Sequence, residues 1–144
     1  MQVIDLPREK PFTLRTIDQA QLHTVWPQVR AGLDVIKAKQ GPDWLPEDIY
    51  TSLKANAATL MMADEADGFL ILQKQQRFYG ACVLVWVCYA PGELARFSRL
   101  VYGELERLAR EVGATRLEMH GRKGWERDPF WTARETIYVH EVEK

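Results

Sequence analysis

The sequence ACVLVWVCYAPG, residues 81–92, decides the fold of this chain. Its first ten residues are apolar or small without interruption, which is typical of a strand buried on both faces of a sheet. Pro91-Gly92 ends that strand, and an amphipathic helix is predicted over 93–112. We expect this helix to pack onto the strand through one apolar stripe, consisting of Leu94, Phe97, Val101, Leu105 and Leu108.

The rest of the chain supplies shorter elements on both sides of this unit. Apolar residues recur every three or four positions from Leu22 to Ile36, which predicts a helix that stops at Gly41-Pro42. Pro46 and two acidic residues open a second helix. Apolar runs and alternation predict further strands, over 12–17, 59–63, 69–75, 114–120 and 133–142. Residues 125–131 read as a short helical turn or loop. The expected fold is α/β, a mixed central sheet with helices on both faces.

Composition limits the classes of function that remain. The chain has 144 residues, 19 basic and 20 acidic, so its net charge is −1. We expect one domain over 1–144, with 1–11 as an extended N-terminal arm. A nearly neutral chain lacks the electrostatic footprint of a strong nucleic-acid binder. The longest apolar stretch is about half of the ~20 residues that span a bilayer, so no membrane partner is expected.

The cysteines and histidines predict neither a disulfide nor a metal site. Cys82 and Cys88 lie six positions apart in one predicted strand, about 20 Å, which exceeds the reach of a disulfide. An even spacing predicts that both face the same side of the sheet. Unpaired cysteines fit a cytoplasmic protein. His23, His120 and His140 are scattered, and no Cys/His pair has the spacing of zinc ligands.

A buried strand leading through Gly92 into a helix resembles the GNAT superfamily of acyl-CoA-dependent N-acyltransferases, over roughly residue 12 to the end. The resemblance implies acetyl-CoA as cofactor, held by backbone groups of the 81–90 strand, Val87 included, and by the start of the helix. The end region MHGRKGWERDPFWTARETIYVHEVE, residues 119–143, is similar to compact GNAT-like proteins of tailed phages and prophages. That similarity implies a virion protein as partner, and association with the virion.

The segment that corresponds to the family's pyrophosphate loop departs from the family pattern. The family has Arg/Gln-x-x-Gly-x-Gly/Ala, and here Tyr89 and Leu94 replace the first and last of these residues while Gly92 is in place. A side chain at Leu94 would crowd a phosphate. Glu93 would compete with a bound anion for the helix N-terminus, and Arg96 and Arg99 offset this if they face the groove. We therefore expect weak binding of acetyl-CoA or none.

Two residues are candidates for acid–base chemistry. His120 ends a predicted strand at the open edge of the expected groove, and imidazole suits a general base near neutral pH. Tyr138 on the last predicted strand can donate a proton to a departing thiolate. Each also has a structural alternative, because His120 can be solvated and Tyr138 can pack. Trp125 and Trp131 either line an acceptor pocket or cap the sheet.

Three classes of function stay open at this point. The first is an N-acyltransferase whose acceptor is a small-molecule or protein amine. The second is a non-catalytic structural or interaction protein of phage or prophage type. The third is a weak phosphate- or nucleic-acid-binding module that uses the basic stripe of helix 93–112, although interleaved glutamates predict mostly surface ion pairs there. A homo-oligomer is compatible with all three.

Overall fold

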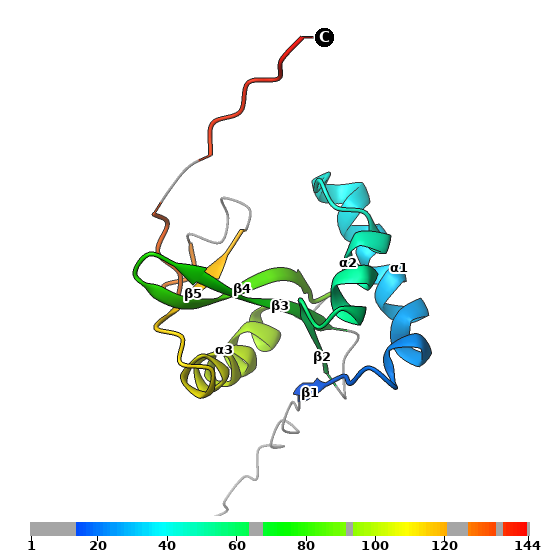
Figure 1. Ribbon diagram of the computed structural model, residues 1–144, viewed down its shortest axis with the longest axis horizontal. Coiled ribbons are helices and arrows are strands. Elements are labelled where there is room, and N and C mark those ends of the chain that lie inside the picture. The colour runs from blue at the N-terminus through cyan, green and yellow to red at the C-terminus, as the bar shows by residue number, and fades with distance from the viewer. Residues whose placement is uncertain (1–13, 64–67, 92–93, 121–126, 135–136, 144) are drawn as a thin grey trace, which may run out of the picture.

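The computed structural model describes residues 14–63, 68–91, 94–120, 127–134 and 137–143, with side chains in helix α3 from Val101 onward. The described strands form one five-stranded sheet in the order β1-β2-β3-β4-β5 (Figure 1). The first four strands are antiparallel neighbours, whereas β4 and β5 run parallel. This confirms the predicted mixed α/β sheet. The elements are β1 Leu14–Thr16, α1 Leu22–Gln40, α2 Pro46–Lys54, β2 Thr59–Ala63, β3 Phe69–Arg77, β4 Gly80–Tyr89, α3 Leu94–Glu111 and β5 Arg116–Met119.

The helix boundaries follow from local chemistry that the sequence displays. Helix α1 ends at Gly41, which adopts a left-handed φ of 58° and donates its N–H to the Lys37 carbonyl at 3.1 Å. Glycine tolerates this conformation because it has no Cβ. At the start of α2, the Asp48 carboxylate accepts a hydrogen bond from the Leu45 N–H at 2.8 Å, and Pro46 fills the first turn. Both ends lie where the sequence predicts them.

Helices α1 and α2 lie on one side of the sheet and α3 on the other (Figure 1), and each side has its own apolar core. On one face, α1 and α2 bury Leu33 and Ile49 against Phe69 of β3. On the other face, α3 packs Val101 and Leu105 against the sheet. Strand β4 lies inside the sheet between β3 and β5, as its unbroken apolar run predicts. The predicted stripe of α3 is confirmed at Val101, Leu105 and Leu108, while the side chains of Leu94 and Phe97 lie outside the described part.

Strand β4 carries a bulge at Trp86. Ile71 pairs with Val87 but its neighbour Leu72 pairs with Val85, so Trp86 has no partner on β3. Such an extra residue interrupts the alternation of side chains. Trp86 and Val87 consequently both pack on the α1/α2 face. The bulge bends β4 and increases its twist just before the strand ends.

The bulge makes the prediction for the two cysteines wrong. Cys88 packs on the α3 face, as does Val83. Cys82 precedes Val83 and points to the opposite face, because no bulge separates the two. The even spacing of six would place both cysteines on one side only in a regular strand. Burial raises the pKa of the Cys88 thiol to about 12.

The predicted last strand, residues 133–142, is wrong over its described C-terminal half. Residues 137–143 have no regular structure, and Figure 1 shows this end of the chain running away from the sheet. The predicted first strand is shorter than expected, with residues 12–13 and the 1–11 arm outside the described residues. Of the described helices, none has the length and apolarity to cross a membrane.

Candidate functional site

The candidate site is the place where β4 and β5 stop pairing, and it is called the candidate groove, or simply the groove, below. The parallel ladder runs from Cys82–Arg116 to Val85–Met119 and ends at the position before the bulge. Strand β4 continues to Tyr89, so the β5 side of residues 86–89 has no strand partner in the described part of the chain. Helix α3 begins five residues after Tyr89, at the same end of the sheet as the carboxyl end of β4. The carboxyl ends of parallel strands beside a crossover helix are the usual place for a ligand in such sheets.

Unpaired strand backbone and a helix N-terminus offer two complementary kinds of binding group. Backbone N–H and C=O groups of an open strand bind an extended amide ligand as another strand would. The free N–H groups at the start of α3 favour an anion. Val87 belongs to this groove through its backbone only, because its side chain is buried against α1 and α2. The groove therefore suits an extended ligand with amides along its length and a phosphate group at its end.

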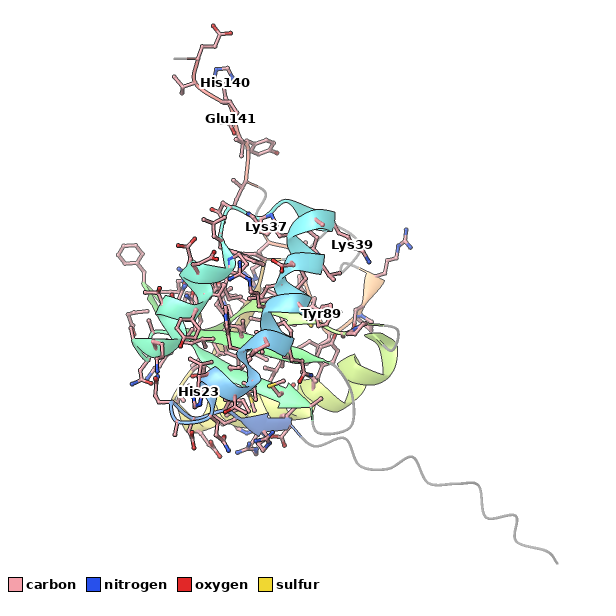
Figure 2. The ribbon with its side chains drawn as sticks, turned by 90° about the vertical axis from the view of Figure 1, so that its right-hand side faces the viewer. His23, Lys37, Lys39, Tyr89, His140 and Glu141 are labelled. Carbon is pink, nitrogen blue, oxygen red and sulfur yellow. The ribbon has the colours of Figure 1, made fainter. Side chains whose placement is uncertain are left out.

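Tyr89, which the resemblance places at the position of the family's arginine or glutamine, packs its ring under α1. It lies 5.2 Å from the Phe69 ring, centroid to centroid, and belongs to the α1/α2 core cluster. Figure 2 labels Tyr89 beside this helix. Gly32 of α1 allows the close approach, since a Cβ there would lie 2.8 Å from Cδ1 of Tyr89. The tyrosine side chain is thus used in the core on the α1 side of β4.

The remaining residues of the predicted pyrophosphate loop are only partly described. Gly92 and Glu93 lie outside the described residues. The backbones of Leu94 and Arg96 form the first turn of α3, and their side chains are outside the described part. The start of α3 is thus placed at the predicted position, and the side-chain roles of these four residues stay predictions.

The two predicted catalytic residues lie in different surroundings. His120 is exposed and directly follows β5, and the β4–β5 register places it level with Trp86 at the groove. Tyr138 is 91% exposed in the terminal segment outside the sheet. Figure 2 shows the same segment, with His140 and Glu141, extending from the body. Of these two described residues, only His120 lies at the groove.

A tyrosine that the sequence does not single out lies beside the segment after β5. The Tyr102 hydroxyl of α3 donates a hydrogen bond to the Asp128 carboxylate and accepts one from Trp131 Nε1 at 3.1 Å. The Phe130 ring stacks on Tyr102 at 3.9 Å between centroids. The Tyr102 hydroxyl, with the Phe130 N–H, lowers the pKa of Asp128 below its ordinary value. This cluster fixes residues 128–131 on α3, and no pattern within one element reveals a contact between residues 26 positions apart.

The same cluster distinguishes the two alternatives for Trp131. Its side chain is half-buried and packs on the α3-side core together with Leu117 and Met119. The two alternatives predicted for Trp131 were to line an acceptor pocket or to cap the sheet. Its packing agrees with capping the sheet. Trp125 and the Gly121–Gly124 loop lie outside the described residues.

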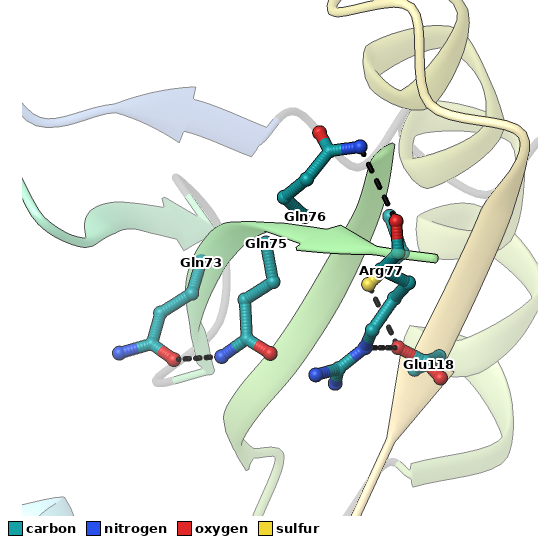
Figure 3. Close-up of polar contacts among 6 residues, drawn as sticks. Gln73, Gln75, Gln76, Arg77 and Glu118 are labelled. Atoms are coloured by element: carbon teal, nitrogen blue, oxygen red, sulfur yellow. Dashed lines mark hydrogen bonds and ion pairs between the residues drawn. The ribbon is translucent and has the colours of Figure 1, made fainter. Parts of the chain in front are cut away.

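A hydrogen-bonded cluster, called the polar tie below, connects β3, β4 and β5. It lies away from the end of the β4–β5 ladder where the groove begins. Glu118 of β5 accepts hydrogen bonds from the Cys82 thiol at 2.7 Å and from Arg77 Nε at 3.0 Å (Figure 3). The thiol hydrogen bond, followed by the Arg77 guanidinium, lowers the pKa of Glu118 below its ordinary value, although burial opposes the shift. Burial and the carboxylate raise the pKa of Cys82. The tie holds β3, β4 and β5 together before β4 and β5 separate.

The lowered pKa of Glu118 predicts a pH-dependent contribution to stability. The folded protein keeps this carboxylate ionised at lower pH than the unfolded chain, so the contribution is present above about pH 4.3 and is lost as pH falls further. We expect Glu118→Gln to lower the free energy of unfolding at pH 7, and the deficit to shrink below about pH 4. Urea unfolding from pH 7 to pH 3 measures it, with the exposed Glu106→Gln as control. A deficit that is constant with pH would contradict the assignment.

The described surface of α3 is charged but internally paired. Arg107 contacts Glu104 at 2.8 Å and also Glu111, and Arg110 lies 4.0 Å from Glu106. Exposed pairs of this kind contribute about 0–1 kcal/mol each. They confirm the surface pairing predicted for this part of the stripe. The described residues contain no cluster of three or more metal-ligating side chains.

A separate cavity of 270 Å³ lies between β1, the start of α1 and the end of α2. Gln19 lines it and donates to the Leu53 carbonyl at 2.6 Å and to Asn56 Oδ1 at 2.8 Å. The Gln19 side-chain amide is thus used within the protein. None of the residues that line this cavity belongs to β4, β5 or α3, so it is distinct from the groove.

Comparison with known proteins identifies the fold. No protein-family model matches the sequence, and the curated proteins gave no significant match. The ribosomal-protein-alanine N-acetyltransferase of Brucella melitensis biovar Abortus 2308 matches at TM-score 0.64 and 16% identity, over 92% of this chain and 99% of its own. An aminoglycoside acetyltransferase from an uncultured soil metagenomic sample, in complex with sisomicin, matches at TM-score 0.64 and 11% identity, over 92% and 97%. An integron cassette protein from the mobile metagenome of V. cholerae matches at TM-score 0.62 and 11% identity, over 94% of each chain. This chain therefore has the fold of the GNAT acetyltransferases.

Proposed function

We propose that this protein is an acyl-CoA-dependent N-acyltransferase that uses acetyl-CoA as its donor. The observation that carries the proposal is the end of the β4–β5 ladder at Val85–Met119, directly before the bulge at Trp86. It leaves open strand backbone beside the start of α3. Coenzyme A has two amides in its pantetheine arm and a pyrophosphate beyond them, which is the sequence of groups that this groove suits. The fold, shared with solved acetyltransferases, supports the same proposal.

The chemical step needs little more than correct placement of two reactants. The acceptor nitrogen attacks the thioester carbonyl carbon, a C–N bond forms, and the C–S bond breaks to release the CoA thiolate. The nitrogen loses one proton, for which His120 is the candidate acceptor at the groove. Holding the amine and thioester in contact is worth several kcal/mol of the barrier by itself. The reaction is therefore compatible with a β4 strand that contains no acidic residue.

The acceptor in this proposal is an amine of a small molecule or of a protein. The two matched acetyltransferases described above act, by their names, on a ribosomal protein and on aminoglycosides. By these names, one acceptor is a protein and the other is an aminoglycoside. The shared fold supports the class of the reaction and leaves both kinds of acceptor in the proposal.

A second candidate is a non-catalytic GNAT-fold protein of phage or prophage type, with a virion protein as partner. One observation favours it. The Tyr89 ring, at the position of the family's phosphate-binding Arg or Gln, is used to pack α1. A protein that no longer binds CoA loses the need for a cationic or amide side chain there, while its fold is retained. Binding of acetyl-CoA separates the two candidates.

Thermal unfolding with acetyl-CoA up to millimolar concentration tests the proposal. A ligand at 100 times its Kd stabilises the folded state by about 2.7 kcal/mol, which for a chain of this size is a Tm increase of several degrees. Under this proposal Tm rises with the logarithm of the acetyl-CoA concentration, and the millimolar upper limit covers the weak binding that Glu93 and Leu94 predict. Gly92→Val should abolish the increase, because a side chain would block approach to the phosphate. Glu93→Gln should enlarge it, because it removes a like charge.

The outcomes of this experiment distinguish an error in the position of the site from an error in the proposed function. A flat Tm up to millimolar acetyl-CoA would contradict the enzyme and support the non-catalytic candidate. An increase that Gly92→Val leaves intact would show that the cofactor binds elsewhere. Desulfo-CoA compared with 3′-phosphoadenosine 5′-diphosphate, which keeps the phosphates and lacks the pantetheine arm, would show whether that arm contributes, as the open β4 backbone requires.

A further inference from the structure

The part of the sheet next to the β3–β4 turn has a polar face to which α1 and α2 do not extend (Figure 1). On β3, the alternation of side chains places Gln73, Gln75 and Arg77 on the α1/α2 side of the sheet, and Figure 3 shows these three on one side of the strand. Glu118 of β5 shares this side because it contacts Arg77, and Arg116 does so because it lies two positions before Glu118. These five residues are called the hairpin face below.

Two aromatic side chains of the adjoining β3–β4 turn are exposed. Phe78 is fully exposed and Tyr79 is 43% exposed. The Arg116 guanidinium lies over the Tyr79 ring, 3.9 Å from its centroid, which holds a flat cation against this ring. Exposed rings and guanidinium planes are the surfaces on which the bases of single-stranded nucleic acids stack. The turn thus offers stacking surfaces that the core of the protein does not use.

The charge of the hairpin face favours an anion. Its one carboxylate, Glu118, already accepts hydrogen bonds from Arg77 Nε at 3.0 Å and from the Cys82 thiol. Arg116 contacts the Tyr79 ring, and within the described residues it forms no hydrogen bond or ion pair. Its five N–H donors are therefore available to a phosphate oxygen.

The two glutamines of the hairpin face add groups that hydrogen-bond to base edges. Gln75 Nε2 donates to Gln73 Oε1 at 2.9 Å (Figure 3). This bond leaves the Nε2 donors of Gln73 and the Oε1 acceptor of Gln75 without a partner among the described residues. Amides of this kind bind the donors and acceptors of base edges, whereas an acidic protein surface would need cations alone. Rings, amides and an unpaired guanidinium together favour a nucleic acid over an acidic protein.

We propose that the hairpin face and the β3–β4 turn bind a short segment of single-stranded nucleic acid. Its bases stack on Phe78 and on the Tyr79–Arg116 pair, and Arg116 holds a phosphate. This binding depends more on stacking than on phosphate contacts, which agrees with a chain of net charge −1. We expect a Kd of about 1–100 μM at 0.15 M salt. The proposal concerns a surface outside the groove and holds whether or not acetyl-CoA binds there.

Two pairs of variants of the full-length protein test the proposal. Phe78→Leu removes the ring but keeps an apolar side chain, and Phe78→Trp keeps a ring. Because Phe78 is fully exposed, neither change disturbs the core. Arg116→Gln removes the unpaired cation of the hairpin face, and Arg110→Gln removes an exposed cation of α3 as the matched control. Fluorescence anisotropy measures binding of a uridine decamer, a thymidine decamer and a GC-rich duplex of ten base pairs, up to 500 μM protein and from 50 to 200 mM salt.

We expect both single-stranded decamers to bind, and the tighter one identifies the sugar that the surface prefers. The duplex should bind at least about fivefold more weakly, because its bases are already stacked on one another. Phe78→Leu should weaken binding of the decamers at least about fivefold, and Phe78→Trp should preserve it. Arg116→Gln should reduce the slope of log Kd against log salt by about 0.7, whereas Arg110→Gln should leave the slope unchanged.

Three results would overturn the proposal. The first is the absence of any anisotropy change at 500 μM protein. The second is equal affinity for the duplex, or a Kd that neither Phe78→Leu nor Arg116→Gln changes. The third is displacement of the decamers by an equal concentration of a glutamate decapeptide, which would identify an acidic protein as the partner instead.

Discussion

Phe69→Ala is expected to lower the free energy of unfolding by about 3–5 kcal/mol. The Phe69 side chain is completely buried on β3, beneath α1 and beside Tyr89. Its removal takes away apolar contacts on all sides and leaves a cavity that the rigid sheet cannot fill. Urea unfolding followed by circular dichroism measures the loss as a lower midpoint.

The matched control is Phe78→Ala. Phe78 is fully exposed in the β3–β4 turn, so its truncation should change the free energy of unfolding by no more than about 0.5 kcal/mol. The pair holds the chemical change constant and varies only the environment. Equal effects at the two positions would contradict the packing of β3 under α1.

Gly32→Ala is expected to destabilise the fold although it adds a better helix former. A Cβ at Gly32 would lie 2.6 Å from Cε1 of Phe69 and 2.8 Å from Cδ1 of Tyr89. Overpacking of this kind costs about 1–3 kcal/mol, and the helix propensity of alanine offsets up to about 1 kcal/mol. We expect a net loss of about 1–2 kcal/mol. Because Tyr89 is the last residue of β4, where the candidate groove lies, the Tm increase with acetyl-CoA should also become smaller.

Gly103→Ala is the control for this substitution. Gly103 lies inside α3 with no atom within 4 Å of an added Cβ. Alanine should therefore stabilise the protein there by about 0.5–1 kcal/mol. The same substitution, glycine to alanine, is thus expected to lower the free energy of unfolding at position 32 and to raise it at position 103. A stabilising Gly32→Ala would show that α1 does not approach β3 and β4 so closely.

Much of the fold can be predicted from the sequence because its strongest pattern lies in its central elements. The apolar run of β4 has one interpretation, a strand inside the sheet, and α3 follows from a stripe with helical period. Strand β2, over Thr59–Ala63, has the predicted limits, and Gly41 ends α1 where expected. These features depend on neighbours in sequence, which is why the sequence reveals them.

The bulge and the irregular C-terminal segment, residues 137–143, could not be predicted, for two different physical reasons. In an entirely apolar run, a bulge changes which face each residue occupies without changing any pattern of polarity, so the separation of Cys82 and Cys88 onto two faces is invisible. The alternation in residues 133–142 indicates a preference for strand, but a strand needs an edge to pair with. Local preference indicates which secondary structure a segment can form. Where that segment pairs depends on the assembled sheet.

The candidate site was predictable in position but not in its side chains. The start of α3 and the end of β4 follow from the 81–92 stretch. The packing of Tyr89 on Gly32 joins residues 57 positions apart, and the Tyr102–Asp128 contact joins two elements that the sequence separates by β5. Such contacts depend on the mutual placement of helices and strands. The position of His120 directly after β5 was predictable because a strand end is local in sequence. Its role stays a prediction.

The parallel pairing of β4 with β5 has a consequence for chain entropy. Its first pair, Cys82 and Arg116, closes a loop of 34 residues, whereas Arg77 and Gly80 close the β3–β4 hairpin across three. Loop-closure entropy grows as (3/2)RT ln n, so the parallel pair requires about 2 kcal/mol more to close than the hairpin. The groove accordingly lies at the β4–β5 pair, whose closure costs more chain entropy than that of the β3–β4 hairpin.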